Sequence, residues 1–248
     1  MAFKRGGVIA RVNRTTRKDE FRGHEDRPCP TLAHQHLGPH HRADRHVHGQ
    51  PKLLARRAGE AIEAGARILG ENYIQEAQKK IEILGAGVSW HFIGHLQKNK
   101  AKYAVRLFDL IHAVDDFALA EELNRTAEKN GKTQEILLQA DLSGEATKFG
   151  AAEGEILKMA ERVAALKNVS VRGLMTMPPW FPDAEAARPF FRALRELRDR
   201  IADRRIPGVE MMELSMGMSD DFVVAGEEGA TIVRIGRAIF GKRPLKSL

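Results

Sequence analysis

Cysteines and long apolar runs are scarce in this chain of 248 residues. It has one cysteine, Cys29, so no disulfide can form within it. No apolar run approaches the roughly 20 residues that a membrane-spanning helix needs, and the first residues lack the apolar core of a secretory signal. These absences predict a protein of the reducing cytoplasm without a membrane partner.

Acidic residues are scarce in the first quarter of the chain. Residues 1–60 hold 13 Lys and Arg against 6 Asp and Glu, whereas the remainder is balanced at 27 against 27, so the whole formal charge of +7 lies there. Seven of the ten histidines lie in the same quarter, without any sustained apolar period. We interpret residues 1–52 as an atypical, poorly ordered basic segment rich in His, Arg and Pro.

Two more specific functions of that basic segment are conceivable. A nucleic-acid-binding arm is one, but acidic residues are interspersed and the only aromatics are Phe3 and Phe21. A metal site is the other, because closely spaced imidazoles suit zinc or nickel. We predict no metal site, and we keep nucleic-acid binding only as an alternative.

From about residue 53 the apolar residues become regularly spaced, which predicts helices alternating with strands. The predicted strands are residues 67–70, 88–94, 107–114, 135–142, 169–177, 209–216 and 231–236. The predicted helices are residues 53–66, 74–84, 97–106, 117–130, 153–166, 184–204, which contains Pro189, and 220–228. Strict alternation at a period of about 25 residues indicates an α/β fold, a (β/α)8 TIM-type barrel, as one domain over residues 53–248.

Such a barrel needs eight strands, and only seven are evident. The eighth should lie just before the helix at Leu53, where no apolar strand pattern stands. The first strand of the barrel is therefore predicted to be missing or irregular. We expect a monomer, with self-association through an open barrel edge as the alternative, because unpaired strand edges invite association.

Small residues follow the last two predicted strands. The chemistry of these barrels lies at the carboxyl ends of their strands, and phosphate is often held after strands seven and eight. Here those ends read "LSMGMSDD" (214–221) and "RIGRAIFG" (234–241), and Ser219 with Asp220 begins a helix. Together these loops predict a phosphate site. Arg234 lies within an apolar strand, so it needs a partner, either an acidic side chain or the ring nitrogen of a heterocycle.

Other strand ends add candidates around that site. Asn72 follows the second barrel strand, and His95 follows the third. Met175 and Met177 end the sixth, where thioethers can line a flat ring rather than bind a metal. His91, inside its strand, is interpreted as a packed core histidine rather than a base.

Five segments carry a family resemblance: "GENYIQEAQKK", "WHFIGHLQKNK", "DLSGEATKFG", "RGLMTM" and "ELSMGMSDDFVVAGEEGATIVRIGRAIFG". From about residue 58 to the end, the chain resembles the pyridoxal phosphate homeostasis proteins, whose fold is the alanine racemase amino-terminal barrel. The resemblance implies a protein that binds pyridoxal 5′-phosphate at the barrel mouth and handles the free cofactor in the cytoplasm, with no established turnover of its own, and we assign no catalytic residue.

The resemblance also implies roles for particular residues. Arg234 would face the pyridine nitrogen, and Asn72 would lie near the ring. The phosphate would be held by Ser215, Met216, Gly217, Ser219, Gly236 and Arg237.

The chain departs from the family at its first strand. Members carry an apolar strand ending in Val-Ser-Lys-Thr, whose lysine forms the Schiff base. Here Lys52 is the only lysine nearby, 18 residues before Gly70, and it follows Gln50-Pro51 without an apolar strand before it. A Schiff base needs an amine with a lowered pKa. An exposed Lys52 on a loop is therefore predicted to bind the aldehyde poorly, if at all.

Several alternatives stay open at this point. Residues up to about 57 either come from a displaced reading frame or are truly divergent. A racemase acting through the same cofactor would need a second domain with a catalytic tyrosine, and the chain has only Tyr73 and Tyr103. A nucleic-acid-binding module using the basic arm is the third.

Overall fold

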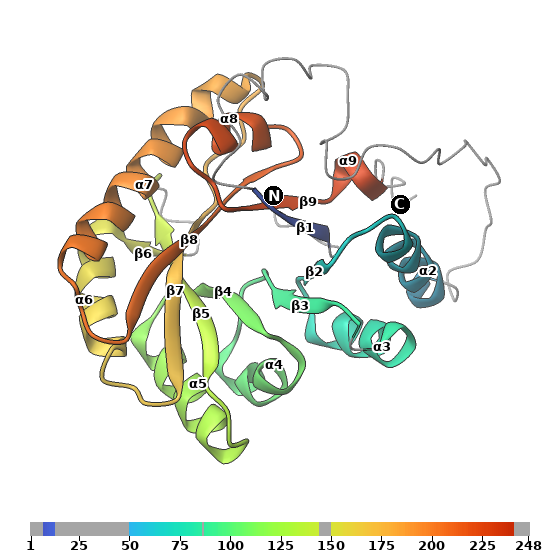
Figure 1. Cartoon of the computed structure of the whole chain (residues 1–248), viewed down its shortest axis with the longest axis horizontal. Coiled ribbons are helices and arrows are strands. Elements are labelled where there is room, and N and C mark those ends of the chain that lie inside the picture. Colours follow the sequence, from blue (N-terminus) through green and yellow to red (C-terminus); the bar gives the residue numbers. More distant parts are fainter. Residues whose placement is uncertain (1–6, 13–49, 86, 144–149, 241–248) are drawn as a thin grey trace, which may run out of the picture.

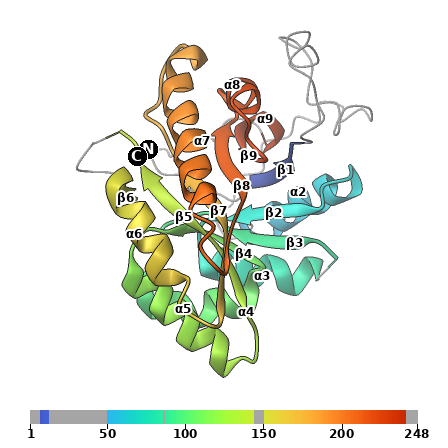
Figure 2. The same cartoon turned by 60° about the vertical axis from the view of Figure 1, so that its left-hand side comes forward.

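The protein is described by a computed structural model that covers residues 7–12, 50–85, 87–143 and 150–240. Figure 1 shows a ring of strands with helices packed around it, and Figure 2 shows the same layers from the side. The strands are β1 (Gly7–Arg11), β2 (Ile68–Glu71), β3 (Ser89–Phe92), β4 (Leu110–Val114), β5 (Gln134–Asp141), β6 (Ala151–Ala152), β7 (Val169–Thr176), β8 (Val209–Met218) and β9 (Ile232–Ile235). The order β4-β3-β2-β1-β9-β8-β7-β5 is closed by pairing of β4 with β5, and the short β6 pairs with β5. The predicted TIM-type barrel is confirmed.

The helices alternate with the strands as predicted. They are α2 (Gln50–Glu63), α3 (Ile74–Leu84), α4 (Ala101–Leu107), α5 (Phe117–Lys129), α6 (Glu153–Val163), α7 (Arg188–Asp203), α8 (Phe222–Glu227) and α9 (Arg237–Phe240), with 3-10 turns η2 (Lys98–Lys100) and η3 (Ala184–Ala187). In the described part of the chain, no helix is long and apolar enough to span a membrane.

Local signals fix the helix ends. The carboxylate of Asp116 accepts a hydrogen bond from the Leu119 N–H at 2.7 Å and so caps α5, and Gly131, with φ of 62°, follows the end of that helix. The helix predicted over residues 184–204 is instead a 3-10 turn followed by α7. This break puts Pro189 in the first turn of α7, where its missing N–H leaves no intrahelical bond unmade.

The strand predicted from residue 107 begins three residues later. Helix α4 continues through Leu107, because the Phe108 N–H donates to the Ala104 carbonyl at 3.0 Å. The Phe108 ring then packs on Phe92 with centroids 5.1 Å apart. An apolar pattern alone did not separate this buried helix end from the start of the strand.

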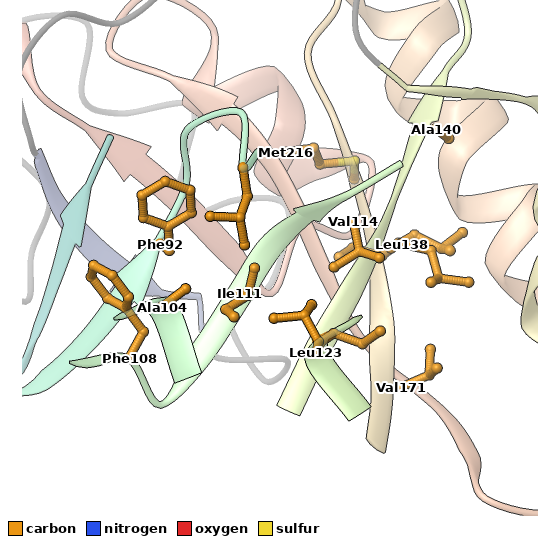
Figure 3. Close-up of a cluster of buried hydrophobic side chains, with 14 of the residues drawn as sticks. Phe92, Ala104, Phe108, Ile111, Val114, Leu123, Leu138, Ala140, Val171 and Met216 are labelled. Atoms are coloured by element: carbon orange, nitrogen blue, oxygen red, sulfur yellow. The ribbon is translucent and has the colours of Figure 1, made fainter. Parts of the chain in front are cut away.

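Two apolar clusters form the core. The larger one lies between the barrel and its helices, where Figure 3 shows Phe92, Ile111, Leu123, Leu138 and Met216 among its members. The smaller one gathers strand side chains of the opposite alternation, and we therefore place it inside the barrel. Its buried members are Ile9, Ile93, Leu110, Ala113, Leu137, Met175 and Ile232.

The first strand is present, which corrects the expectation that it is missing. Strand β1 lies between β2 and β9 and pairs with both in the antiparallel sense, with Val8 opposite Leu69 and Ile235. Val8 is buried in the outer cluster and Ile9 in the inner one. The strand is irregular in its direction alone. A reversed strand still points alternate side chains inward and outward, so it can pack into the barrel.

Closure by β1 has two consequences. The open edge between the second and eighth barrel strands, on which the expected self-association depended, is filled. Within residues 1–52, which we expected to be poorly ordered, residues 7–11 form β1 and α2 begins at Gln50. Residues 1–6 and 13–49 lie outside the described part of the chain.

The reversal also exchanges the ends of the strand. Gly7 lies at the mouth formed by the carboxyl ends of the other strands, opposite Gly70, and a Cβ there would be 3.0 Å from the Ile235 carbonyl oxygen. Arg11 lies at the opposite end, where its guanidinium is 2.9 Å from the Glu213 carboxylate.

Candidate functional site

Backbone N–H groups converge on one oxygen at the ends of β8 and β9. The Ser219 Oγ, just after β8, accepts hydrogen bonds from the Gly236 N–H at 3.3 Å and the Ala238 N–H at 3.2 Å. Both donors follow β9. Such an arrangement suits an anion oxygen, because main-chain N–H groups that point to one place form an anion cradle. The predicted phosphate loops are therefore brought together.

Glycine is required at one point of this cradle. Gly217 has φ of 89°, a conformation that side chains rarely adopt, and a Cβ there would lie 2.5 Å from the Ala225 Cβ. Because α8 packs so closely against β8, the turn that carries Ser219 is held in one position.

Charged side chains flank the cradle on its solvent side. The Arg237 guanidinium is ion-paired with Asp220, which also accepts from the Trp180 indole N–H at 3.4 Å. Asp221 accepts from the Met218 N–H at 2.6 Å, and burial raises the pKa of its carboxyl. Asp220 thus holds the Arg237 guanidinium beside the cradle.

A small cavity adjoins these charged groups. It has a volume of about 80 Å³ and is lined by Trp180, Phe181, Pro182, Ala184, Ala187, Met218, Asp220 and Asp221. Small-molecule pockets are typically about 300–1,000 Å³. The cavity is thus too small to be a binding site for a ring and its phosphate.

Arg234 is buried beneath the cradle with neutral partners. It is 3% exposed, and its guanidinium donates to the Ser215 Oγ at 2.7 Å and to the Thr176 carbonyl at 2.9 Å. Burial lowers its pKa to about 10, with attraction from Asp221 opposing the shift, so it stays a cation at neutral pH. Among the described residues no carboxylate forms an ion pair with Arg234, and its charge is free to act on a ligand.

Two histidines extend this buried network. His112 Nδ1 lies 2.9 Å from the Ser215 Oγ, and His112 Nε2 lies 3.0 Å from His91 Nδ1. Burial lowers the pKa of His91 to about 4 and holds that of His112 well below its usual range. His91 is therefore a buried, neutral histidine, as expected. His112 was not among the predicted residues, although a histidine inside the apolar run "LIHAV" was a signal for it.

The remaining predicted residues lie after β2, in the inner cluster and in the outer cluster. Asn72 is buried after β2, and Gly94 packs on it so closely that a Cβ would lie 2.4 Å from the Asn72 carbonyl oxygen. Met175 is buried in the inner cluster, with Met177 against it. Met216 points into the outer cluster (Figure 3), so only its backbone can face a ligand at the mouth.

The predicted lysine lies elsewhere in the fold. Lys52 belongs to helix α2 rather than to a loop, and its side chain lies outside the described residues. The mouth end of β1, where the family lysine would be sought, is occupied by Gly7.

A ring with a phosphate group fits the donors present. The cradle offers two main-chain N–H groups and a hydroxyl, Arg234 offers a buried cationic N–H, and Met175 offers apolar surface. This set suits an anionic group joined to a flat heterocycle with a basic nitrogen.

Comparison with known proteins agrees with this chemistry. Residues 34–244 match the model of the alanine racemase N-terminal domain family. The pyridoxal phosphate homeostasis protein of Aquifex aeolicus is 46% identical over 185 residues, which covers 74% of this chain and 80% of that protein. The chain belongs to the pyridoxal phosphate homeostasis proteins. The Escherichia coli K12 member is 39% identical over 188 residues, covering 74% of this chain and 79% of that one.

Solved structures place the family member within a wider fold. PipY of Synechococcus elongatus, whose structure contains bound pyridoxal phosphate, has a TM-score of 0.70 and 38% identity over 75% of this chain and 87% of PipY. An alanine racemase of Clostridium difficile has a TM-score of 0.64 at 13% identity, covering 77% of this chain and 49% of the racemase, a likeness of fold alone.

Proposed function

We propose that this chain binds pyridoxal 5′-phosphate at the barrel mouth, without a covalent bond, as part of cofactor homeostasis in the cytoplasm. The observation that carries the proposal is the cradle at Ser219, where the Gly236 and Ala238 N–H groups converge above the buried Arg234. When bound, the cofactor brings an aldehyde that reacts with amines.

The phosphate is the group that the chain's own residues bind best. The Gly236 and Ala238 N–H groups, which donate to the Ser219 Oγ in this structure, would instead donate to the phosphate oxygens. The Ser219 hydroxyl would donate to the phosphate as well. Hydrogen bonds to a charged acceptor contribute about 1.5–3 kcal/mol each. Arg237 would exchange Asp220 for the phosphate.

The ring lies over Arg234 and Met175 in this proposal. Arg234 donates to two neutral acceptors and has further N–H groups, one of which would donate to the ring nitrogen. Met175 and Met177 would contact the ring, because thioethers pack well against flat aromatic surfaces. Asn72 would lie beside it.

The absence of covalent binding rests on β1. The strand runs in the reverse direction, its mouth residue is Gly7, and none of its five residues is a lysine. Close to this side of the barrel, the Lys80 ammonium is buried against Glu71 at 2.6 Å, so it is held in an ion pair in the helical layer. With this strand, a family member would keep the residues for the phosphate, and among the described residues of β1 it would offer no amine to the aldehyde.

Ligands that differ by one group test the proposal. We expect pyridoxine 5′-phosphate, which has no aldehyde, to bind within about threefold of pyridoxal 5′-phosphate, and pyridoxal, which has no phosphate, to bind at least about 100-fold more weakly. Equilibrium dialysis measures all three. Equal binding of pyridoxal would show that the phosphate cradle is not the anchor, and much weaker binding of pyridoxine 5′-phosphate would show a covalent contribution.

The chain acts as a monomer without nucleic-acid partners in this proposal. Closure of the barrel by β1 supports the monomer, because neighbouring strands pair along both of its sides. Light scattering at micromolar concentration tests the monomer. A nucleic acid that binds near physiological salt would contradict the second part.

A further inference from the structure

Four buried side chains from four strands form a continuous chain across the barrel beneath the cradle. They are Arg234 of β9, Ser215 of β8, His112 of β4 and His91 of β3, joined by contacts of 2.7, 2.9 and 3.0 Å. All four are buried. The proposed binding of the cofactor uses Arg234 directly and gives the two histidines no role.

The number of protons limits how these groups can bond. Arg234 can only donate, so the Ser215 Oγ is the acceptor between them. Burial keeps both histidines neutral at pH 7, with the charge of Arg234 also opposing protonation of His112. A neutral imidazole has one N–H. His112 therefore either donates from Nδ1 to Ser215, or accepts there and donates from Nε2 to His91.

The two arrangements differ in what Ser215 does. An N–H bond from a cation polarises the hydroxyl and makes its O–H a stronger donor, and hydrogen bonds that run in one direction strengthen each other. This favours the order Arg234 to Ser215 to His112 to His91. In that order the Ser215 proton points to His112 and a lone pair points to Arg234.

We propose that His112 is a positioning residue for the cofactor site, because its Nδ1 holds the Ser215 hydroxyl and so directs the Arg234 guanidinium toward the ring. His91 accepts from His112 Nε2 and fixes the tautomer. The inference rests on the proposed function, and it adds a pair of histidines that touch no ligand. Arg234 is held by the Ser215 hydroxyl and the Thr176 carbonyl, neither of which neutralises its charge.

The tautomers can be observed without any ligand. In nitrogen-15 spectra of the cofactor-free chain with labelled histidine, we expect His112 to carry its proton on Nε2 and to have a bare Nδ1. His91 should likewise be protonated on Nε2. A proton on Nδ1 of His112 would overturn the proposal, because Ser215 would then accept from both neighbours.

A double-mutant cycle tests the effect on binding. We expect His112→Phe to weaken binding of pyridoxal 5′-phosphate about tenfold and to shift the absorbance maximum of the bound cofactor. In a Ser215→Ala background the same change should have no further effect. His112→Asn, whose side-chain oxygen can accept from Ser215, should restore most of the affinity, and Thr126→Val, at a buried polar residue on α5, is the matched control.

Two failures are distinguishable in this cycle. If His112→Phe weakens binding equally in both backgrounds, His112 does not act through Ser215 and the inference is wrong while the proposed function stands. If the unmodified chain does not bind the cofactor, the proposed function is wrong and the role of His112 falls with it.

Discussion

The two sides of the barrel mouth differ in the polar groups that they offer to a ligand. On the β8–β9 side, the Gly236 and Ala238 N–H groups converge on the Ser219 Oγ near the buried Arg234. On the β1–β2 side, a reversed strand fills the space and offers Gly7 at the mouth. Packing needs only the right alternation of side chains, whereas a binding site needs a particular residue at a particular strand end. A barrel can therefore close with a strand that carries no lysine at the mouth.

Disruption of β1 should have the largest effect. Ile9→Asp places a carboxylate in the inner cluster, where Ile9 is 3% exposed, and we expect it to lower the free energy of unfolding by more than about 4 kcal/mol. Urea unfolding measures the change. An effect below about 1 kcal/mol would mean that β1 does not close the barrel.

The pH dependence of stability reports on the barrel interior. The folded-state pKa of His91, about 4, is below the ordinary value of 6.5, so the unfolded chain binds more protons between these values. Stability from this group is fully present above pH 6.5 and is lost as pH falls toward 4. At 1.36 kcal/mol per pKa unit, this amounts to about 3 kcal/mol.

His91→Phe removes this titration and provides the comparison. The buried Glu71 and the partly buried Asp115 and Asp221 have raised pKa values and give the opposite slope, but these carboxyls are common to both chains. Urea unfolding from pH 7 to pH 4 should show a smaller loss in the variant. Parallel curves would indicate that His91 is not neutral in the folded barrel.

Substitutions of Ser219 and Lys52 compare the phosphate cradle with the predicted lysine. Ser219→Ala removes the hydroxyl of the cradle, and we expect it to weaken binding of pyridoxal 5′-phosphate about tenfold. Lys52→Ala should leave the affinity unchanged within about twofold. Equilibrium dialysis measures both affinities, with Lys158→Ala, an exposed change on α6, as the control. A larger loss of affinity in Lys52→Ala than in Ser219→Ala would contradict a phosphate-anchored, noncovalent site.

The smallest effect is expected at the far end of β1. The Arg11 side chain is 62% exposed, so its ion pair with Glu213 is largely screened by solvent. Arg11→Ala should change the free energy of unfolding by less than about 1 kcal/mol. A larger loss in urea unfolding would show that the pair, rather than Val8 and Ile9, holds the strand in place.

The barrel and the position of the cradle could be predicted from the sequence, because local sequence patterns determine them. Alternating helices and strands predicted the barrel, and the small residues around Ser219 and Gly236 at strand ends predicted the cradle. The direction of β1 could not be read, since Gly7–Arg11 is five residues long and alternation is the same in both directions. Nor could the contact between His112 and Ser215, because it joins residues that are 103 positions apart.

Borohydride trapping shows whether any lysine of this chain forms a Schiff base with the cofactor. The purified chain is mixed with pyridoxal 5′-phosphate, its absorbance spectrum is recorded, and the sample is reduced and mapped by peptide mass spectrometry. For noncovalent binding, we expect the spectrum of a bound free aldehyde. We also expect no single lysine to be modified above the level of surface lysines. A Schiff-base band that traps onto one lysine, Lys52 above all, would contradict noncovalent binding.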